Sequence, residues 1–313
     1  MLSYILRRLA SGLTLLVSIA FITFALLSIS ARNVARSILG TNATPEQVAA
    51  KEQELGLDRP MILRFFEWLL NAAQGDLGYS WFSSQTVLES LGTRVPVTLT
   101  IVTAVTLISA LVSFLLGLAA GVWRGWLDKL VQILAVVGYA LPGFLIALFL
   151  VTQFAVRWGW FPATGYTAPS VSVPGWVLGV TLPVASLSIS AISATAQQVR
   201  SATIDVLRQD YVRTLRSRGL PENRVILLHV VKNASAPALT VLALQFVGML
   251  GGAVVVEQIF TIPGLGSVAV TSTSQGDVPL VMGLVMVTVL FVIVINLLVD
   301  IAVGWLNPKA RVA

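Results

Sequence analysis

Six stretches of the chain are long, apolar and free of charged residues, and this feature limits the folds that the chain can adopt. They cover residues 9–30, 95–122, 130–156, 175–199, 235–256 and 278–299. A helix needs about 20 mostly apolar residues to cross the hydrocarbon core of a membrane, and it satisfies its backbone polar groups within its own segment. The chain is therefore predicted to be an all-α integral membrane protein with six transmembrane helices.

The overall composition agrees with a membrane protein. Apolar residues make up 56% of the 313 residues and charged residues only 11%, whereas soluble domains carry about 25% charged residues. A net charge of +6 would suggest nucleic acid as the partner of a soluble chain, but in so apolar a chain basic residues are expected at the cytoplasmic membrane surface. The absence of cysteine excludes disulfides and cysteine-ligated metals. We expect a lipid bilayer around the chain and no nucleic acid.

The distribution of Lys and Arg predicts which side of the membrane each loop faces. Seven basic residues lie in the long connection 200–232, and others precede the first apolar stretch and follow the last one. The two short loops on the opposite side contain only Arg157 as a basic residue. Because cytoplasmic loops are enriched in Lys and Arg, both termini are predicted to be cytoplasmic. The first apolar stretch is too long for the core of a cleaved signal peptide and is interpreted as a retained helix.

The outer segment 31–94 is predicted to form a small helical subdomain between the first two transmembrane helices. Thr44 and Pro45 are typical of a helix start, and Gly56 is expected to end that helix. A second helix is predicted after Pro60, and a turn is predicted at 75–78. Its apolar residues are spaced as one face: Ile62, Phe65, Phe66 and Leu69. Two interpretations stay open, a cap packed on the transmembrane helices or a docking surface for an extracytoplasmic partner.

The inner connection 200–232 contains a predicted helix, a bend and a second helix. The first helix is expected to extend to Arg218, because Gly219 favours a helix end. Pro221 and Glu222 then have the residue types of a new helix start. Taken alone, a charged loop of this kind satisfies the topology rule and needs no further role.

The residues of this connection match a known pattern. Asp-Tyr-Val-Arg-Thr at 210–214 is followed by Arg216, by Gly-Leu at 219–220, by His229, by Lys-Asn-Ala at 232–234 and by Pro237. This series resembles the EAA loop of permease subunits in ATP-binding-cassette (ABC) importers. Leu215 stands where the family usually has a small alanine.

Further matches along the whole chain make it similar, more narrowly, to the B-type permease subunit of oligopeptide and dipeptide importers. They are the N-terminal segment around Tyr4, and the sequences at 55–60, 75–80, 251–266, 277–279, 296–300 and 307–309. Two departures lie on the outer side. Residues 29–33 replace the family's Pro-Gly-Asp-Pro, and Gly276 replaces the arginine before Asp277. Both concern partner docking or substrate preference rather than the transport class.

The resemblance implies the type I ABC importer permease fold and a place in the bacterial cell (inner) membrane. It divides the chain into an N-terminal amphipathic segment with the first transmembrane helix (1–30), the extracytoplasmic subdomain (31–94) and a core permease domain (95–313). In this family the connection 200–232 forms coupling helices that sit in a groove of the ATPase subunit. The expected coupling residues are Asp210, Tyr211, Arg213, Thr214, Leu215, Arg216, Gly219, Leu220, Pro221, Glu222 and Arg224.

The resemblance also implies the partners and the cargo. We expect a second homologous permease subunit, two ATP-binding subunits and an extracytoplasmic substrate-binding protein, with a short peptide (a di- or oligopeptide) as the substrate. ATP and Mg are expected on the ATPase subunits. No cofactor is expected on this chain, which contains no Gly-x4-Gly-Lys-Ser/Thr phosphate-binding loop. Family members that carry nickel, glutathione or an oligosaccharide keep those cargoes open.

A stand-alone secondary carrier or channel is the alternative from another class. Ion-coupled carriers usually hold the coupling ion with an ionisable side chain inside the membrane, and no charged residue lies near the middle of the six apolar stretches. The single histidine, His229, cannot form a metal cluster and is expected to make hydrogen bonds at the inner surface. No nucleophile and base are arranged as in an intramembrane enzyme, so the chain is predicted not to be an enzyme itself.

Small and polar residues on two of the apolar stretches are candidates for the translocation path. They recur at helical spacing on one face and are Ser186, Ser190, Ser193, Gln197, Gly248 and Gly252. Small residues at this spacing also serve helix packing, so both interpretations stay open. Pro142 and Pro183 are expected to kink their helices.

Overall fold

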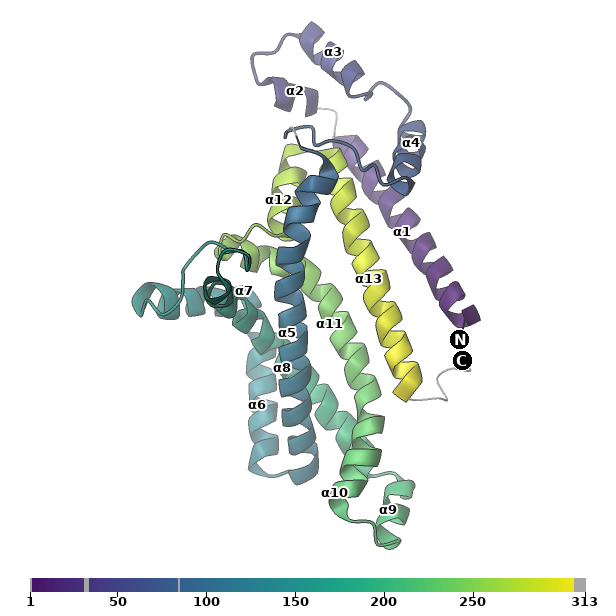
Figure 1. Cartoon of the computed structure of the whole chain (residues 1–313), viewed down its shortest axis with the longest axis vertical. Coiled ribbons are helices and arrows are strands. Elements are labelled where there is room, and N and C mark those ends of the chain that lie inside the picture. The colour runs from purple at the N-terminus through teal and green to yellow at the C-terminus, as the bar shows by residue number, and fades with distance from the viewer. Residues whose placement is uncertain (1, 31–33, 84, 307–313) are drawn as a thin grey trace. The chain divides into compact units, whose positions relative to one another are not determined.

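The computed structural model describes residues 2–30, 34–83 and 85–306, and its α-helices are labelled in Figure 1. The described residues form helices and loops, with one isolated antiparallel bridge between Tyr79 and Thr86. The helices are α1 (Leu2–Ser30), α2 (Val34–Leu39), α3 (Pro45–Glu54), α4 (Met61–Ala73), α5 (Val87–Trp123), α6 (Trp126–Ala140), α7 (Gly143–Leu150), the π-helical segment η2 (Val151–Arg157), α8 (Val173–Leu207), α9 (Asp210–Ser217), α10 (Glu222–Val225), the π-helical segment η3 (Ile226–Val230), α11 (Val231–Ile259), α12 (Leu265–Gln275) and α13 (Val278–Leu306). The prediction of an all-α protein is confirmed.

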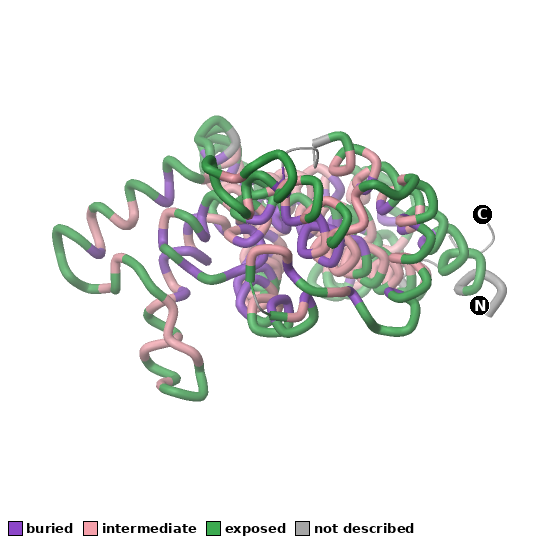
Figure 2. The backbone as a smooth tube through the Cα atoms, turned by 90° about the horizontal axis from the view of Figure 1, so that it is seen from above, coloured by how far each residue is buried: buried purple, intermediate pink, exposed green. Residues whose placement is uncertain are grey.

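The transmembrane helices predicted from the apolar stretches are present. Within the described residues, α1, α5, α8, α11 with the segment before it, and α13 are each long and apolar enough to cross a membrane. A sixth candidate is the pair formed by α6 and α7 with η2, which is bent by 94°. Large apolar side chains stay exposed along these helices, as at Leu13, Leu107 and Leu298, and Figure 2 shows exposed and buried positions interleaved along the backbone. Such faces suit contact with lipid or with other membrane helices.

The bend in the third apolar stretch is located at Pro142, as predicted. Helix α6 ends at Ala140, and Leu141 has an extended backbone with ψ of 117°. A residue that precedes proline is kept out of the helical conformation by the proline ring, so a new helix starts after Pro142. Pro183, in contrast, lies inside α8, which continues through it.

The chain folds as two compact units. One contains residues 1–98 and 263–294, and the other contains residues 99–262 and 295–313. Helices α5 and α13 each contribute to both units, because two of the three unit boundaries, after residues 98 and 294, fall within these helices, whereas the third, after residue 262, lies in the loop between α11 and α12. The division of the chain into the segments 1–30, 31–94 and 95–313, which the resemblance implies, stays a prediction.

Phe65 of α4 lies at the centre of the core of the first unit. It is 2% exposed and packs with Ala20 and Phe24 of α1 and with Met282 of α13. The Phe65 and Phe24 ring centroids lie 5.6 Å apart. Helix α4 therefore fastens the outer segment to the transmembrane helices of this unit.

The outer helices begin and end where the sequence predicts, but their apolar residues do not all face the core. Thr44 and Gln47 form a capping box at the start of α3, and Gly56 has the positive φ of 66° expected at a helix end. Of the four residues predicted to share one apolar face, Phe65 is buried, whereas Ile62 and Phe66 are 56% and 54% exposed. Helix α4 carries apolar residues on several sides, and only the side around Phe65 packs against the core.

A buried carboxylate, Asp277, connects two distant segments of the first unit. Asp277 is 1% exposed. One carboxylate oxygen accepts a hydrogen bond from the Ser80 hydroxyl, and the other accepts bonds from the backbone N–H groups of Trp81 (3.2 Å) and Leu280 (3.4 Å). The first turn of α13 and the segment after α4 are thereby held together, which compensates for burying the charge.

Helix α8 is the centre of the second unit, because it packs against α6, α7 and α11. Glycines allow its close approach to α5: a Cβ at Gly117 would lie 2.5 Å from the carbonyl oxygen of Ala196. The Ser193 hydroxyl of α8 packs against Gly138 of α6 and lies 3.2 Å from the carbonyl oxygen of Leu134. Helix α8 thus has a fixed position within this unit.

Candidate functional site

Residues 208–230, called here the α9–α10 stub, follow α8 and lead into α11. Helix α8 ends at Leu207 with Arg208 as its C-cap, Gln209 is extended with ψ of 145°, and α9 starts at Asp210. The segment up to Arg218 is mostly helical, as the sequence predicts, but the helix is interrupted at Arg208 and Gln209, which was not predicted. The break turns the chain so that Val212 is fully buried against Val206 and Leu207 of α8.

The bend between α9 and α10 is located at Gly219, as predicted. Gly219 has φ of 79°, a left-handed conformation that glycine adopts without strain. The backbone N–H of Gly219 donates to the carbonyl of Arg216 at 2.9 Å, and that of Leu220 donates to the carbonyl of Leu215 at 3.3 Å. Helix α10 restarts at Glu222 directly after Pro221.

An ion pair spans this bend. The Arg216 guanidinium donates two hydrogen bonds to the Glu222 carboxylate, with 2.9 Å between Nε and Oε2. The carboxylate holds the pKa of Arg216 above its ordinary value. Both side chains are about half exposed, so the pair contributes at most about 1 kcal/mol to stability, and it joins the last turn of α9 to the first turn of α10.

The stub has a small apolar core of its own. Val212, Val225 and Val230 are each 0% exposed and pack with Leu215 and Leu220, among others. Leu215, which replaces the usual small residue, is therefore half-buried inside the stub. The larger side chain fills the core of the stub rather than projecting from it.

The surface of the stub carries most of the predicted coupling residues. Nine of the eleven are exposed, whereas Leu215 and Leu220 are half-buried. Tyr211 is additionally tied to the start of α11, because the Asn233 amide donates to its hydroxyl at 3.0 Å. The same amide donates to the backbone carbonyl of His229 at 2.8 Å. The structure thus brings the predicted coupling residues together on one compact projection.

A second ion pair connects α8 to α6, and sequence reasoning did not pair its members. The Arg200 guanidinium donates to the Asp128 carboxylate, with 3.0 Å between Nη2 and Oδ2. The side chains are 16% and 17% exposed. Arg200 lies two turns before the end of α8, so this bond attaches α6 to the helix that enters the stub. The partners are 72 residues apart in the sequence, and no local pattern joins them.

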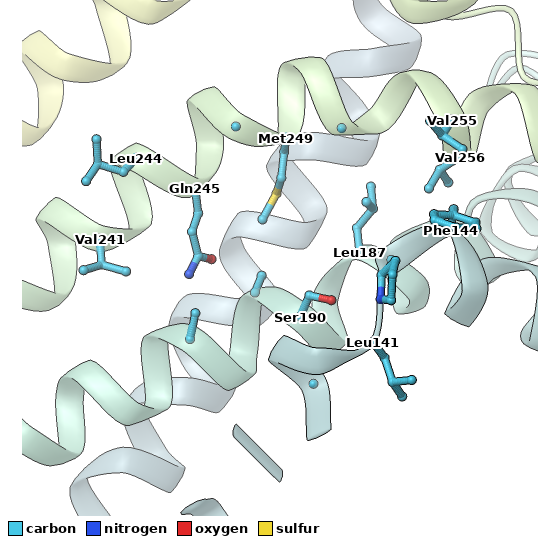
Figure 3. A pocket seen from close by; sticks show the side chains of 17 residues that line it. Leu141, Phe144, Leu187, Ser190, Val241, Leu244, Gln245, Met249, Val255 and Val256 are labelled. Atoms are coloured by element: carbon cyan, nitrogen blue, oxygen red, sulfur yellow. The ribbon is translucent and has the colours of Figure 1, made fainter. Parts of the chain in front are cut away.

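A cavity of about 740 Å³ lies in the second unit, between the α6–α7 bend, α8 and α11 (Figure 3). Its lining is mostly apolar. The only polar side chains in the lining given by the described residues are Ser190 and Gln245. The full set is Gly138, Leu141, Pro142, Gly143, Phe144, Leu187, Ser190, Ala191, Ala194, Val241, Leu244, Gln245, Gly248, Met249, Gly252, Val255 and Val256.

Three of the six candidate path residues line this cavity. They are Ser190 on α8 and Gly248 and Gly252 on α11. A Cβ added at either glycine would meet no atom within 4 Å in the described structure, so these glycines do not serve helix packing within the chain. Gln245 was not predicted, although its position three residues before Gly248 places it on the same helical face.

The other three candidates lie outside the cavity lining. Ser186 is buried and donates to the carbonyl of Pro183 at 2.7 Å. Ser193 packs against α6, as described above. Gln197 is half-buried, and its side-chain oxygen has no hydrogen-bond partner in the described structure. Packing within the second unit accounts for Ser186 and Ser193 without a transport role.

Comparison with known proteins gives consistent matches over nearly the whole chain. Residues 113–312 match the model of the family described as binding-protein-dependent transport system inner membrane component, and residues 1–102 match the model of its N-terminal region. A putative peptide transport system permease protein of Brucella abortus is 36% identical over 312 residues, 99% of each chain. A probable peptide ABC transporter permease protein of Sinorhizobium fredii is 34% identical over 98% of this chain and 99% of its own. A glutathione transport system permease protein of Salmonella typhimurium is 35% identical over 99% of each chain.

Proposed function

The chain belongs to the family of binding-protein-dependent transport system inner membrane components, and from that premise we propose that it forms part of the path by which short peptides enter the cell. As a family member it is a permease subunit of an ABC importer and a multi-pass protein of the bacterial inner membrane, not an ATPase itself. In the proposal it pairs with a second homologous permease, two ATPase subunits supply the energy, and an extracytoplasmic binding protein delivers the peptide.

The names of the relatives support the cargo. Full-length relatives from Brucella and Sinorhizobium are named for peptide transport. Glutathione is the second candidate, because an equally similar relative is named for its transport. Glutathione is itself a tripeptide, so both candidates contain amide bonds, but its first amide is formed by the side-chain carboxyl group of glutamate.

One structural relation carries the coupling proposal. The two helices that line most of the cavity, α8 and α11, are also the helices that enter and leave the α9–α10 stub. A force applied to the stub is therefore transmitted to both walls of the cavity through continuous helices. The valine core of the stub and the Arg216–Glu222 pair make it a rigid lever.

The proposed mechanism follows from this connection. With the stub on the cytoplasmic side, closure of the two ATPase subunits on ATP moves it as a unit. Helices α8 and α11 follow, and α6 moves with α8 because the Asp128–Arg200 pair holds them together. The cavity then opens alternately to each side of the membrane, and a peptide released by the binding protein passes through it.

A charge reversal in the stub tests the coupling proposal. The substitution Arg216→Glu places two carboxylates across the bend, and we expect the ATP-driven uptake of a labelled tripeptide to fall about tenfold or the ATPase subunits to be lost from the purified complex. The double variant Arg216→Glu with Glu222→Arg restores an ion pair in which the two charges have exchanged positions. Recovery in the double variant would assign the effect to the geometry of the bend.

A matched control lies in the outer segment. Arg59 and Glu67 form a similar ion pair, with side chains 48% and 50% exposed, compared with 42% and 51% for Arg216 and Glu222. The substitution Arg59→Glu should leave the amount of bound ATPase unchanged. Normal uptake and normal ATPase binding in the Arg216→Glu variant would contradict the coupling proposal.

A further inference from the structure

Two residues of the cavity lining each have a side-chain oxygen without a hydrogen-bond partner in the described structure. These oxygens are Oγ of Ser190 and the side-chain oxygen Oε1 of Gln245, and both atoms are covered in the described structure. Buried polar atoms in proteins are mostly paired; of the eleven buried side-chain polar atoms without a partner in the described structure, these two are the ones whose residues line the cavity. In a transport protein that changes shape, one explanation is that the missing partner belongs to the molecule that enters the cavity.

The two groups are placed on opposite walls of the cavity. Figure 3 shows Gln245 pointing from α11 toward α8, on which Ser190 lies, with Met249 and Leu187 beside them. Gly248 and Gly252 leave the backbone of α11 uncovered on the same wall, since a Cβ at either position would meet nothing within 4 Å. The cavity, at about 740 Å³, has the size of sites that hold small organic ligands.

The chemistry of the lining suits the uncharged main-chain amide groups of a peptide rather than its charged termini. No charged side chain belongs to the lining formed by the described residues, so a charged group inside the cavity would lose its hydration without gaining a counter-charge. An amide supplies both a donor and an acceptor, and a hydroxyl supplies one donor and accepts as well. A peptide bond presents the complementary pair, an N–H and a C=O. The apolar walls meanwhile accept side chains of different shapes.

We propose that Gln245 and Ser190 bind the main-chain amide groups of the peptide as it passes through the cavity. The inference rests on the peptide cargo proposed above and adds how this chain contacts it. Binding in the cavity then depends on the peptide backbone and differs little between peptides with different side chains. Selection among peptides is left to the binding protein.

The test uses the whole complex, with both permease subunits, the ATPase subunits and saturating binding protein, in vesicles that contain ATP. Uptake of labelled trialanine is compared with that of its analogue in which one amide N–H is replaced by an ester oxygen. Gln245→Leu should lower the uptake of trialanine by about three- to tenfold, the range for one lost hydrogen bond. Ser190→Ala should lower it less. The ratio of trialanine uptake to ester uptake should also be smaller in Gln245→Leu, because the oxygen that accepts a hydrogen bond from the amide N–H is absent.

The same chain offers a matched control. Ser188 also lies on α8 and has a buried hydroxyl without a partner, but it does not line the cavity. The substitution Ser188→Ala should therefore leave both uptake and the preference unchanged. The binding protein is identical in all measurements, so its own preference cancels when variants are compared.

Each other outcome overturns the inference. If the Gln245→Leu complex transports both compounds at the rates of the unmodified complex, Gln245 does not bind the peptide backbone. If the variant chain fails to assemble with the second permease, Gln245 instead contacts that subunit. If the unmodified complex takes up no peptide at all, the proposed cargo is wrong, and this result is distinguishable because it appears before any substitution is made.

Discussion

Asp277 and its neighbour Gly276 show how single residues hold the outer part of the first unit. Gly276 has φ of 78° and ends α12, and a Cβ at this position would lie 2.7 Å from Cγ2 of Val34. An arginine, which the family usually has here, would therefore be strained by both the backbone and the contact. Asp277 then begins the turn into α13 and accepts three hydrogen bonds. The glycine departure thus follows from local packing in this chain.

Removal of the Asp277 carboxylate should destabilise the protein markedly. The substitution Asp277→Ala leaves the Ser80 hydroxyl and the N–H groups of Trp81 and Leu280 without their acceptor, and buried donors in that state cost free energy. We expect a loss of about 2–4 kcal/mol in the free energy of unfolding. Thermal unfolding of the purified protein in detergent measures the change as a lower melting temperature.

Asp76 provides the comparison for this prediction. Its carboxylate is exposed and accepts one backbone hydrogen bond in the same region, from Gly78 at 2.9 Å. Asp76→Ala should cost about 1 kcal/mol or less. Equal melting temperatures for the Asp277→Ala and Asp76→Ala variants would contradict the role given to Asp277.

At the scale of helices, glycines have two different uses in this chain. On α5, Gly117 allows contact with α8, where a Cβ would lie 2.7 Å from Cβ of Val199. On α11, Gly248 and Gly252 face open space beside the cavity. The sequence shows glycines at helical spacing in both places, and only the packing of α8 tells the two uses apart.

A leucine at each kind of glycine should therefore have different effects. Gly252→Leu adds its side chain to free space, so we expect a folded complex that takes up peptide at less than about a tenth of the normal rate, because the cavity is narrowed. Gly117→Leu cannot be accommodated without separating α5 from α8, and overpacking of this kind destabilises a fold by about 1–3 kcal/mol or more. Size-exclusion chromatography and uptake in vesicles measure the two effects.

The result for Gly252→Leu shows whether the α11 glycines line the translocation path or pack against the second permease subunit. A variant with normal assembly and normal uptake would show that the cavity is not on the path. Loss of the second permease subunit from the variant complex would show that this face of α11 packs against it.

The sequence predicts the elements whose causes are local. The six apolar stretches, the cap at Thr44, the break at Pro142 and the turn at Gly219 each depend on residues within a few positions, and the structure confirms them. The break at Gln209 was not predicted, because it arises when Val212 packs against α8. The Asp128–Arg200 pair and the unpaired oxygen of Gln245 depend on residues far apart in the chain, and periodicity carries no signal for either.

At the scale of the whole molecule, the second compact unit places a cavity and a protruding stub at different points on the same two helices. Nothing in the described residues forms a group of three His, Asp or Glu side chains that could hold a metal ion. The cavity lining formed by those residues is uncharged. In the proposed mechanism, separate ATPase subunits that act on the stub supply the energy.

The most direct test of this account is the energy dependence of peptide uptake. The complete complex is placed in vesicles together with binding protein, and the uptake of labelled trialanine is followed with ATP, with a non-hydrolysable ATP analogue, and with an imposed proton or sodium gradient alone. Vesicles that contain only this chain serve as the control. We predict uptake only by the complete complex and only with ATP. Uptake by this chain alone, or uptake driven by an ion gradient without ATP, would contradict the account.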